Sequence, residues 1–409
     1  MSEVEFELRK LGDLIEIFNN KRVPLSAKQR EGLEKIYPYY GAQGIVDYVD
    51  DYIFEGKYIL IAEDGENLKS NNKSICTLAT GKYWVNNHAH IIKGNDKTNT
   101  DFLYYKLNSI NFAPYITGSA QPKLNKENLL KIELYIPSKE YQDKIAKVLT
   151  LLDQKIKINN QINQELEAMA KTLYDYWFVQ FDFPDQNGKP YKSSGGKMVY
   201  NPELKREIPE GWGVETLRDL ESKIITGKTP SRTNSDNFGG KIPFITIGDI
   251  RGNTFIYSTA ESLTDLGASV QQNKYLPEGS LCVSCIATVG EIGFTTEWSH
   301  TNQQINSIVF EDETHRYYLY FALKNYFENA KASAKTGNTF ANMNKEDFSG
   351  IRIILPRNEI KNNFHKITEP YFAQIKCLQG QNQELTQLRD WLLPMLMNGQ
   401  VKVELRKEA

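Results

Sequence analysis

The sequence predicts a mixed α/β (α+β) protein in which two similar globular domains are separated by two long antiparallel helices, which form a coiled-coil-like spacer with pseudo-twofold symmetry. The first observation behind this is an internal repeat: residues 117–178 align without a gap on residues 336–397, with 16 of 62 positions identical. The second is the segment 138–178, which has no glycine or proline and carries a heptad pattern. A period of roughly 200 residues is too long for a solenoid unit of about 20 to 50, so the chain holds two domain-sized modules.

Each copy divides into a globular part and a helix. The globular domains are expected at residues 1–137 and 213–356, the spacer helices at 138–180 and 357–409 (the second with a tail), and a connector at 181–212. Short β-forming runs separated by Gly, Asn and Pro fill the globular parts, for example at 57–62 and 88–92.

The segment 138–178 is predicted to be one helix, with Ser138 as a plausible N-cap. Its apolar or small residues alternate in steps of four and three: Ile145, Leu149, Leu152, Ile156, Asn159, Asn163, Leu166, Ala170, Leu173 and Trp177. About 40 residues at roughly 1.5 Å each make a rod of about 60 Å. A single amphipathic helix of that length needs a partner.

The repeat supplies the partner, because matching apolar positions recur in the second helix. Pro370, Gly380 and Pro394 interrupt that helix, so kinks or a broken first turn are expected there. We predict that the two helices pair with each other; the alternative is that each packs on its own domain. The equivalent seam residues Asn163 and Asn382 are candidates for fixing the register, without needing to touch each other. The connector, rich in turns and aromatic residues, is expected to lie against the rod.

Composition narrows the class of protein. The 409 residues suffice for two or three domains, and a net charge of −2 requires any polyanion binding to come from local basic patches. The four cysteines have no framework spacing, and neither a signal peptide nor a membrane-spanning segment is recognisable. A soluble cytoplasmic protein is expected.

Motifs for catalysis or metal binding are incomplete. The run Gly227-Lys228-Thr229 lacks the glycine that a phosphate-binding P-loop needs at Ser222. Cys282 and Cys285 stand on opposite faces of a strand-like run without a second pair, and are expected to be core residues. The pair His88 and His90 has no evident third ligand. No catalytic residue, metal site or methyltransferase signature is therefore assigned to this chain.

Polar stretches recur instead at equivalent places in both copies, where Lys and Arg can reach phosphates and guanine, and Asn and Gln can pair with adenine. The candidate DNA-contacting residues are Lys21, Arg22, Gln43, Lys82, Asn86, Asn87, His88, Gln121 and Lys123 in the first copy, and Lys228, Thr229, Ser231, Arg232, Asp249, Arg251, Thr288, Gln303, Gln304 and Asn338 in the second. A shared framework with different polar loops is what two domains that recognise different DNA sequences would need.

These stretches, in this order and twice over, resemble the specificity subunit of a type I restriction-modification system. The resemblance is carried by Gly227-Lys-Thr-Pro-Ser231 before Ile242-Pro-Phe-Ile-Thr-Ile-Gly-Asp249, by Gly118-Ser-Ala-Gln-Pro-Lys-Leu-Asn125, and by the connector from Trp177 to Trp212. It implies two target-recognition domains, at 1–137 and 213–356, which read the halves of a split site on double-stranded DNA.

The resemblance also implies that this chain is non-catalytic. Its partners would be two modification (methyltransferase) subunits, which bring S-adenosylmethionine and adenine methylation, and restriction subunits, which bring ATP- and Mg²⁺-dependent translocation and cleavage; no cofactor is bound by the chain itself. Two alternatives remain at this point: a self-sufficient DNA-modifying enzyme with an unrecognised site, and a scaffold that binds proteins only.

Overall fold

The computed structural model describes residues 5–65, 68, 75–118, 122–334 and 342–404. It comprises two compact units, one formed by Met1–Lys155 with Leu385–Ala409 and the other by Ile156–Glu384. Each unit therefore contains one globular part and a stretch of each long helix. Within the described ranges, no helix combines the length and apolar character needed to cross a membrane.

The first unit is built on two four-stranded sheets and one strand pair. The first sheet has the order β2 (Ile15–Ile17), β9 (Ala89–Gly94), β6 (Tyr58–Ala62), β7 (Cys76–Ala79). The second has the order β4 (Gly44–Val49), β3 (Tyr37–Gly41), β8 (Lys82–Val85), β5 (Phe54–Glu55), and β1 (Glu7–Lys10) pairs antiparallel with β10 (Glu133–Ile136). Its short helices are α1 (Ala27–Arg30), α2 (Thr100–Asn108) and α3 (Lys126–Leu130).

Strand β6 shows why its sequence is apolar throughout instead of alternating. Ile59 and Ile61 enter the core that includes residues of α2 and the first long helix, whereas Leu60 enters a second core with Tyr83 and Val85. A strand whose two faces are both buried has no polar face. The β-forming run predicted at 57–62 is therefore a central strand.

The second unit repeats this plan. Its larger sheet has the order β14 (Ile224–Thr226), β21 (Ile305–Ile308), β18 (Leu281–Ser284), β19 (Ile292–Thr295), β16 (Phe255–Ile256), and its smaller one has β17 (Glu261–Leu263), β15 (Phe238–Ile245), β20 (His300–Thr301). The pair β13 (Gly213–Thr216) and β22 (Arg352–Leu355) matches β1 and β10. Its helices are α5 (Leu217–Leu220), α6 (Ile247–Ile250), α7 (Asp265–Ser269), α8 (Arg316–Ala334) and α9 (Lys345–Ser349).

Corresponding strands also pair in corresponding directions. β3 runs parallel to β8 in the first unit, as β15 runs parallel to β20 in the second. In the sheet β2-β9-β6-β7 and in the equivalent run β14-β21-β18-β19, neighbouring strands are antiparallel. The sequence repeat is thus a repeat of the fold.

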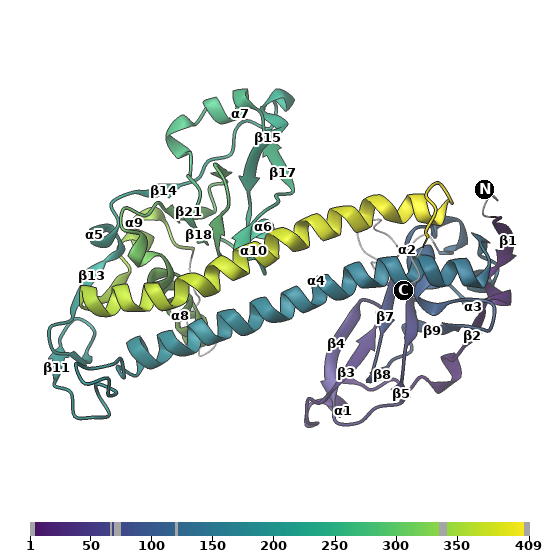
Figure 1. Ribbon diagram of the computed structural model, residues 1–409, viewed down its shortest axis with the longest axis horizontal. Coiled ribbons are helices and arrows are strands. Elements are labelled where there is room, and N and C mark those ends of the chain that lie inside the picture. Colours follow the sequence, from purple (N-terminus) through teal and green to yellow (C-terminus); the bar gives the residue numbers. More distant parts are fainter. Residues whose placement is uncertain (1–4, 66–67, 69–74, 119–121, 335–341, 405–409) are drawn as a thin grey trace. The chain divides into compact units, whose positions relative to one another are not determined.

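The two long helices are α4 (Lys139–Tyr174), which continues through a π-helical turn at Asp175–Val179, and α10 (Asn358–Met397). They lie side by side and run antiparallel (Figure 1). Within the second unit, Asn159 Nδ2 donates to Asn382 Oδ1 at 2.9 Å, and the rings of Trp177 and Phe364 lie 6.1 Å apart. Within the first unit, an ion pair of 2.8 Å joins Arg389 to Asp153. The predicted pairing is confirmed.

The expectation of a broken turn in the second helix is wrong, because α10 runs without interruption from Asn358 to Met397. Its packing with α4, with the core of the second unit around Pro370 and with the core of the first unit around Pro394, offsets the backbone hydrogen bonds lost at the two prolines. Gly380 has a packing role: a Cβ there would lie 3.1 Å from the Tyr257 ring, whose hydroxyl donates to the Lys376 carbonyl at 2.7 Å.

The connector folds as a hairpin of β11 (Met198–Asn201) and β12 (Arg206–Pro209). Its aromatic residues pack on the end of α4, as expected: the rings of Phe178 and Trp212 are 5.9 Å apart, and Phe183 stacks on Trp212 at 4.9 Å. The connector is therefore part of the main core of the second unit.

Candidate nucleic-acid interface

In the first unit, the predicted polar loops converge where β2 and β6 end and β9 begins. We call this edge the first tip; it consists of residues 19–22, 41–44, 63–65, 86–88 and 122–123. The Glu63 amide donates to the His88 carbonyl at 2.9 Å, and the Asn86 amide donates to the Tyr40 carbonyl at 3.0 Å. These backbone bonds bring together loops that lie far apart in sequence.

Charged side chains at the first tip gather around Glu63. Arg22 Nη1 donates to Glu63 Oε2 at 2.7 Å, and Lys123 Nζ lies 3.3 Å from Glu63 Oε1. Burial opposes ionisation of the Glu63 carboxyl, but the Arg22 hydrogen bond and the neighbouring cationic groups bring its pKa below the usual value. The carboxylate is therefore charged at neutral pH.

Arg22 is mostly occupied by the fold. Besides Glu63, its guanidinium donates to the carbonyls of Asn19, Asn87 and Ala89 at 3.0 to 3.1 Å, and only 17% of its side chain is exposed. Its hydrogen bonds therefore connect its own loop to the loops that contain Glu63 and Asn87.

The two histidines near this edge have separate partners. His88 is half exposed and its Nδ1 lies 2.9 Å from Asp64 Oδ2. His90 is buried, and burial lowers its pKa, so that its neutral ring accepts from Asn19 Nδ2 at 2.8 Å and donates to the Leu124 carbonyl at 2.7 Å. No cluster of three or more potential metal ligands occurs among the residues that the structure describes.

The remaining first-copy candidates vary in position. Lys21, Gln43, Asn87 and Lys123 are exposed at the first tip, and Asn86 is half-buried there. Lys82 stands at the other end of β8, with its Nζ 4.5 Å above the Tyr52 ring, and so lies apart from this group. Gln121 lies outside the described residues.

In the second unit, the equivalent edge is formed where β14 and β18 end and β21 begins. This second tip consists of residues 227–229, 285–288, 302–304 and 342. Lys228 is exposed, and its amide donates to the Thr301 carbonyl at 3.0 Å. Thr229 Oγ1 donates to Gln303 Oε1 at 2.6 Å, and the Cys285 amide donates to the Gln304 carbonyl at 2.8 Å.

Gly227 shows why the local sequence looks like a fragment of a phosphate loop. A Cβ at this position would lie 2.2 to 2.3 Å from the Thr301 side chain and from the Thr301 and Asn302 carbonyls. Glycine is therefore required by the close approach of two backbone segments.

Two arginines of the second copy are exposed but held by carboxylates. Arg251 donates to Thr288 Oγ1 at 3.3 Å and lies 3.6 Å from Glu291. Arg232 makes a two-pronged pair with Glu261 at 2.7 and 2.8 Å, beside β17 and outside the second tip. Ser231, near Arg232, is exposed and bonded to Thr233.

Asp249 is a predicted contact that the fold uses internally. Its buried carboxylate accepts from the amide and hydroxyl of Thr246 at 2.7 Å and from the Ala260 amide at 2.8 Å, and so caps α6. Gln304 is half-buried and accepts from Asn302 at 3.1 Å. Asn338 lies outside the described residues.

Three residues of these tips were not anticipated from the sequence: Glu63, Asp64 and Asn342. Asn342 Oδ1 accepts from the Ala287 amide at 3.1 Å, and Ala287 has a φ of 64°. The repeat offered a signal, because Asn342 stands 219 residues after the candidate Lys123. Cys282 and Cys285 enter different cores, as expected, and burial raises their pKa values to about 12 and about 11.

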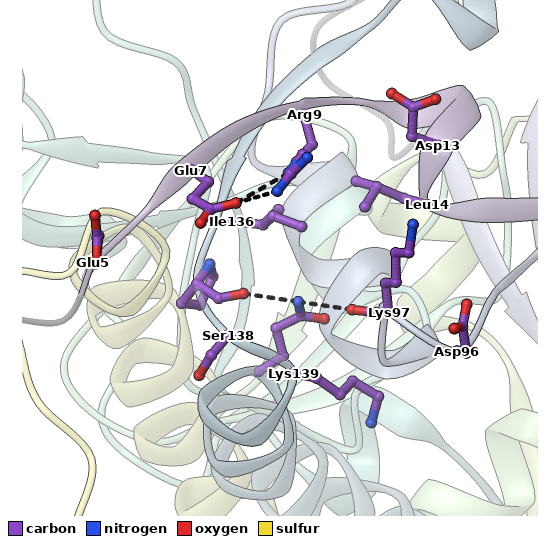
Figure 2. Close-up of a pocket in the computed structure, with 12 residues that line it drawn as sticks. Glu5, Glu7, Arg9, Asp13, Leu14, Asp96, Lys97, Ile136, Ser138 and Lys139 are labelled. Atoms are coloured by element: carbon purple, nitrogen blue, oxygen red, sulfur yellow. Dashed lines mark hydrogen bonds and ion pairs between the residues drawn. The ribbon is translucent and has the colours of Figure 1, made fainter.

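A pocket of about 530 Å³ lies in the first unit where β1, β10 and the start of α4 meet (Figure 2). Glu7 pairs with Arg9 on its wall, and buried Gln142 donates to the carbonyls of Lys97 and Pro137. The carboxylates that line it are Glu5, Glu7, Asp13 and Asp96. These four carboxylates outnumber the three cationic side chains that also line the pocket, Arg9, Lys97 and Lys139, so the pocket is not positively charged and the tips remain the better candidates for DNA.

Comparisons with known proteins agree with this arrangement. The family model for the type I restriction modification DNA specificity domain matches residues 3–168 and 209–387. The specificity subunit of the type I restriction enzyme HindI from Haemophilus influenzae is 32% identical over 402 residues, covering 85% of this chain and 84% of that protein. The MjaIX specificity subunit of Methanocaldococcus jannaschii is 29% identical over 315 residues, covering 75% and 70%. A crystal structure of the type I S subunit from M. genitalium shares the fold, with a TM-score of 0.59, 15% identity and 97% coverage of both chains.

Proposed function

Because this chain belongs to the family of type I restriction-modification specificity subunits, we propose that its two globular domains, residues 1–137 and 213–356, each read one half of a two-part DNA sequence. As a member of that family it is the non-catalytic subunit that recognises the DNA target within its complex. The alternatives of a self-sufficient enzyme and of a protein-only scaffold are thereby set aside.

The observation that carries the proposal is the pair of tips. Both lie at the same edge of the same sheet plan and both carry a lysine, Lys21 or Lys228, but the first has His88 and Lys123 where the second has Gln304 and Asn342. Base edges are distinguished by donors and acceptors, so a common framework with exchanged polar groups supports reading two different sequences. The exposed lysines are the groups we assign to phosphates or guanine, and the exposed amides those we assign to adenine.

The paired helices α4 and α10 are proposed to set the spacing between the half-sites. Two modules that read one side of a duplex favour half-sites about one turn, or roughly 10 bp, apart. The partners proposed for this chain are two methyltransferase subunits, which use S-adenosylmethionine on adenine, and restriction subunits, which use ATP and Mg²⁺.

The test is to map methylated adenines in the genome of a host that carries this protein with its partners. We expect one motif with two specific half-sites separated by a constant number of unspecified base pairs. A matched strain with this gene deleted should lose methylation at every occurrence of the motif. A continuous motif, or methylation that persists in the deletion strain, would contradict the proposal.

A further inference from the structure

Within the first tip, the Glu63 carboxylate contacts two cations: Arg22, which the fold holds in place, and Lys123, whose side chain is half exposed. Its Oε2 is bound by Arg22 at 2.7 Å, and Arg22 is itself held by three backbone carbonyls. Its Oε1 faces Lys123 Nζ at 3.3 Å. Only 15% of the Glu63 side chain is exposed, compared with 53% of the Lys123 side chain.

The backbone fixes the same pair. The Leu124 amide donates to the Glu63 carbonyl at 2.9 Å, and Asp64 forms an isolated bridge with Lys123. Glu63 and Lys123 are therefore held together through main chain and side chain. This differs from a surface ion pair, which loses much of its attraction to side-chain disorder.

A lysine held in this way differs from a free one in two respects. Ordering a lysine side chain costs conformational entropy, and here the cost falls on folding instead of on DNA binding. Since an ammonium group has three donors and Glu63 takes one, two remain for the acceptors of a base edge. The carboxylate also places a negative charge beside the path of the phosphates, which weakens binding that is independent of sequence.

We propose that Glu63 is the positioning residue of the first tip: it holds Lys123 for contact with a base edge and, by its charge, lowers sequence-independent affinity, so that it sharpens discrimination at the first half-site. This inference rests on the proposed function of the tips in reading DNA. The second tip has no counterpart among its described residues, because Cys285 stands at the position of Glu63, and Asn342 at that of Lys123.

The experiment uses the assembled complex with its modification subunits and measures binding to duplexes over a range of salt. One duplex carries the mapped motif, others carry single-base changes in either half-site, and one lacks the motif. For Glu63→Gln we expect discrimination at one half-site to fall by about tenfold, the size of one lost base contact. Affinity for the duplex without the motif should rise, and the slope of log K against log salt should steepen by about 0.9, as expected for one additional phosphate contact.

The matched control is Glu140→Gln, which removes the same charge from an ion pair with Lys144 on α4 and leaves the tip intact. It should change none of the three quantities: discrimination at the half-sites, affinity for the duplex without the motif, and the salt slope. Lys123→Gln should reduce discrimination at the same half-site as Glu63→Gln, and the double variant should lose no more than Lys123→Gln alone, because the carboxylate acts through the lysine.

Damage to the fold would weaken binding to every duplex, including the one without the motif. That result for Glu63→Gln, undiminished discrimination at both half-sites, or an equal loss at both, would each overturn the role assigned to Glu63. These outcomes are separate from failure of the proposed function, which would appear as a wild-type complex that prefers neither half-site.

Discussion

The two tips hold equivalent loops together through different kinds of hydrogen bond. Arg22 and Thr229 both stand five residues beyond paired strand positions, Ile17 in β2 and Ile224 in β14, and each ties its loop to the segment that leads into the neighbouring strand. Arg22 does so through a partly buried charge network, whereas Thr229 does so through one neutral hydrogen bond to Gln303. The sheet plan therefore tolerates either solution, but in the charged one the loss of Arg22 takes the closest cation away from a partly buried carboxylate.

The largest expected effect comes from breaking that network. Arg22→Ala removes the guanidinium that donates to the partly buried Glu63 carboxylate and to three carbonyls, and should cost the first unit about 3 kcal/mol. Thr229→Ala, the matched change in the second unit, removes one neutral hydrogen bond and should cost about 1 kcal/mol. Hydrogen exchange of β6 and β9, compared with β18 and β21, measures each unit in the intact chain.

A double change provides the control. Replacing Glu63 by Gln in the Arg22→Ala background removes a partly buried charge that has lost its closest cationic partner, so part of the lost protection of β6 and β9 should return. Equal losses of protection for Arg22→Ala and Thr229→Ala would show that the two side chains stabilise their units equally, which would contradict the difference proposed between the tips.

A second contrast concerns the strand that runs parallel to β3 or β15. Trp84 in β8 and His300 in β20 occupy the same place, opposite Tyr39 and Phe244 respectively. Trp84 Nε1 donates to the Val23 carbonyl at 2.6 Å. His300 is fully buried against the Tyr275 ring, and its nitrogens have no hydrogen-bond partner in the described part of the chain.

Burial lowers the pKa of His300 from 6.5 to about 4, so the folded second unit should lose stability on acidification. Between pH 6.5 and 4, the His300 ring binds a proton in the unfolded chain but stays neutral in the folded chain. The stability that the second unit gains from keeping His300 neutral is therefore fully present above pH 6.5, and about 2 kcal/mol of it is lost at pH 5.

His300→Phe keeps a ring on Tyr275 and removes the titration. The difference in hydrogen-exchange protection of β15 between pH 7 and pH 5 should shrink in this variant, while that of β3 should stay as in the wild type. A wild-type loss for β15 that His300→Phe leaves unchanged would assign the acid sensitivity to other groups.

The regular elements were predictable because their signals are local. The absence of Gly and Pro with a sustained heptad located α4 to within a few residues, and an apolar β-branched run located β6. The continuity of α10 through Pro370 and Pro394 was not predictable, because it depends on packing against partners distant in sequence. The same limit applies at the tips: the contact of Glu63 with Arg22 spans 41 residues and that of Thr229 with Gln303 spans 74, so residue types suggested candidates without showing which are occupied by the fold.

A third contrast lies at the helix seam, where Asn163 and Asn382 are equivalent positions of the repeat. Asn382 accepts from Asn159 at 2.9 Å and donates to Asn160 Oδ1 at 2.7 Å, whereas the buried Asn163 amide has no hydrogen-bond partner among the residues described. Asn163→Leu should therefore stabilise the second unit by about 1 kcal/mol, and Asn382→Leu should destabilise it by about 1 kcal/mol because it leaves the buried Asn159 Nδ2 without its acceptor. Hydrogen exchange of residues 156–174 measures both variants, and a loss of protection in Asn163→Leu would mean that this amide holds the register through a partner such as a bound water.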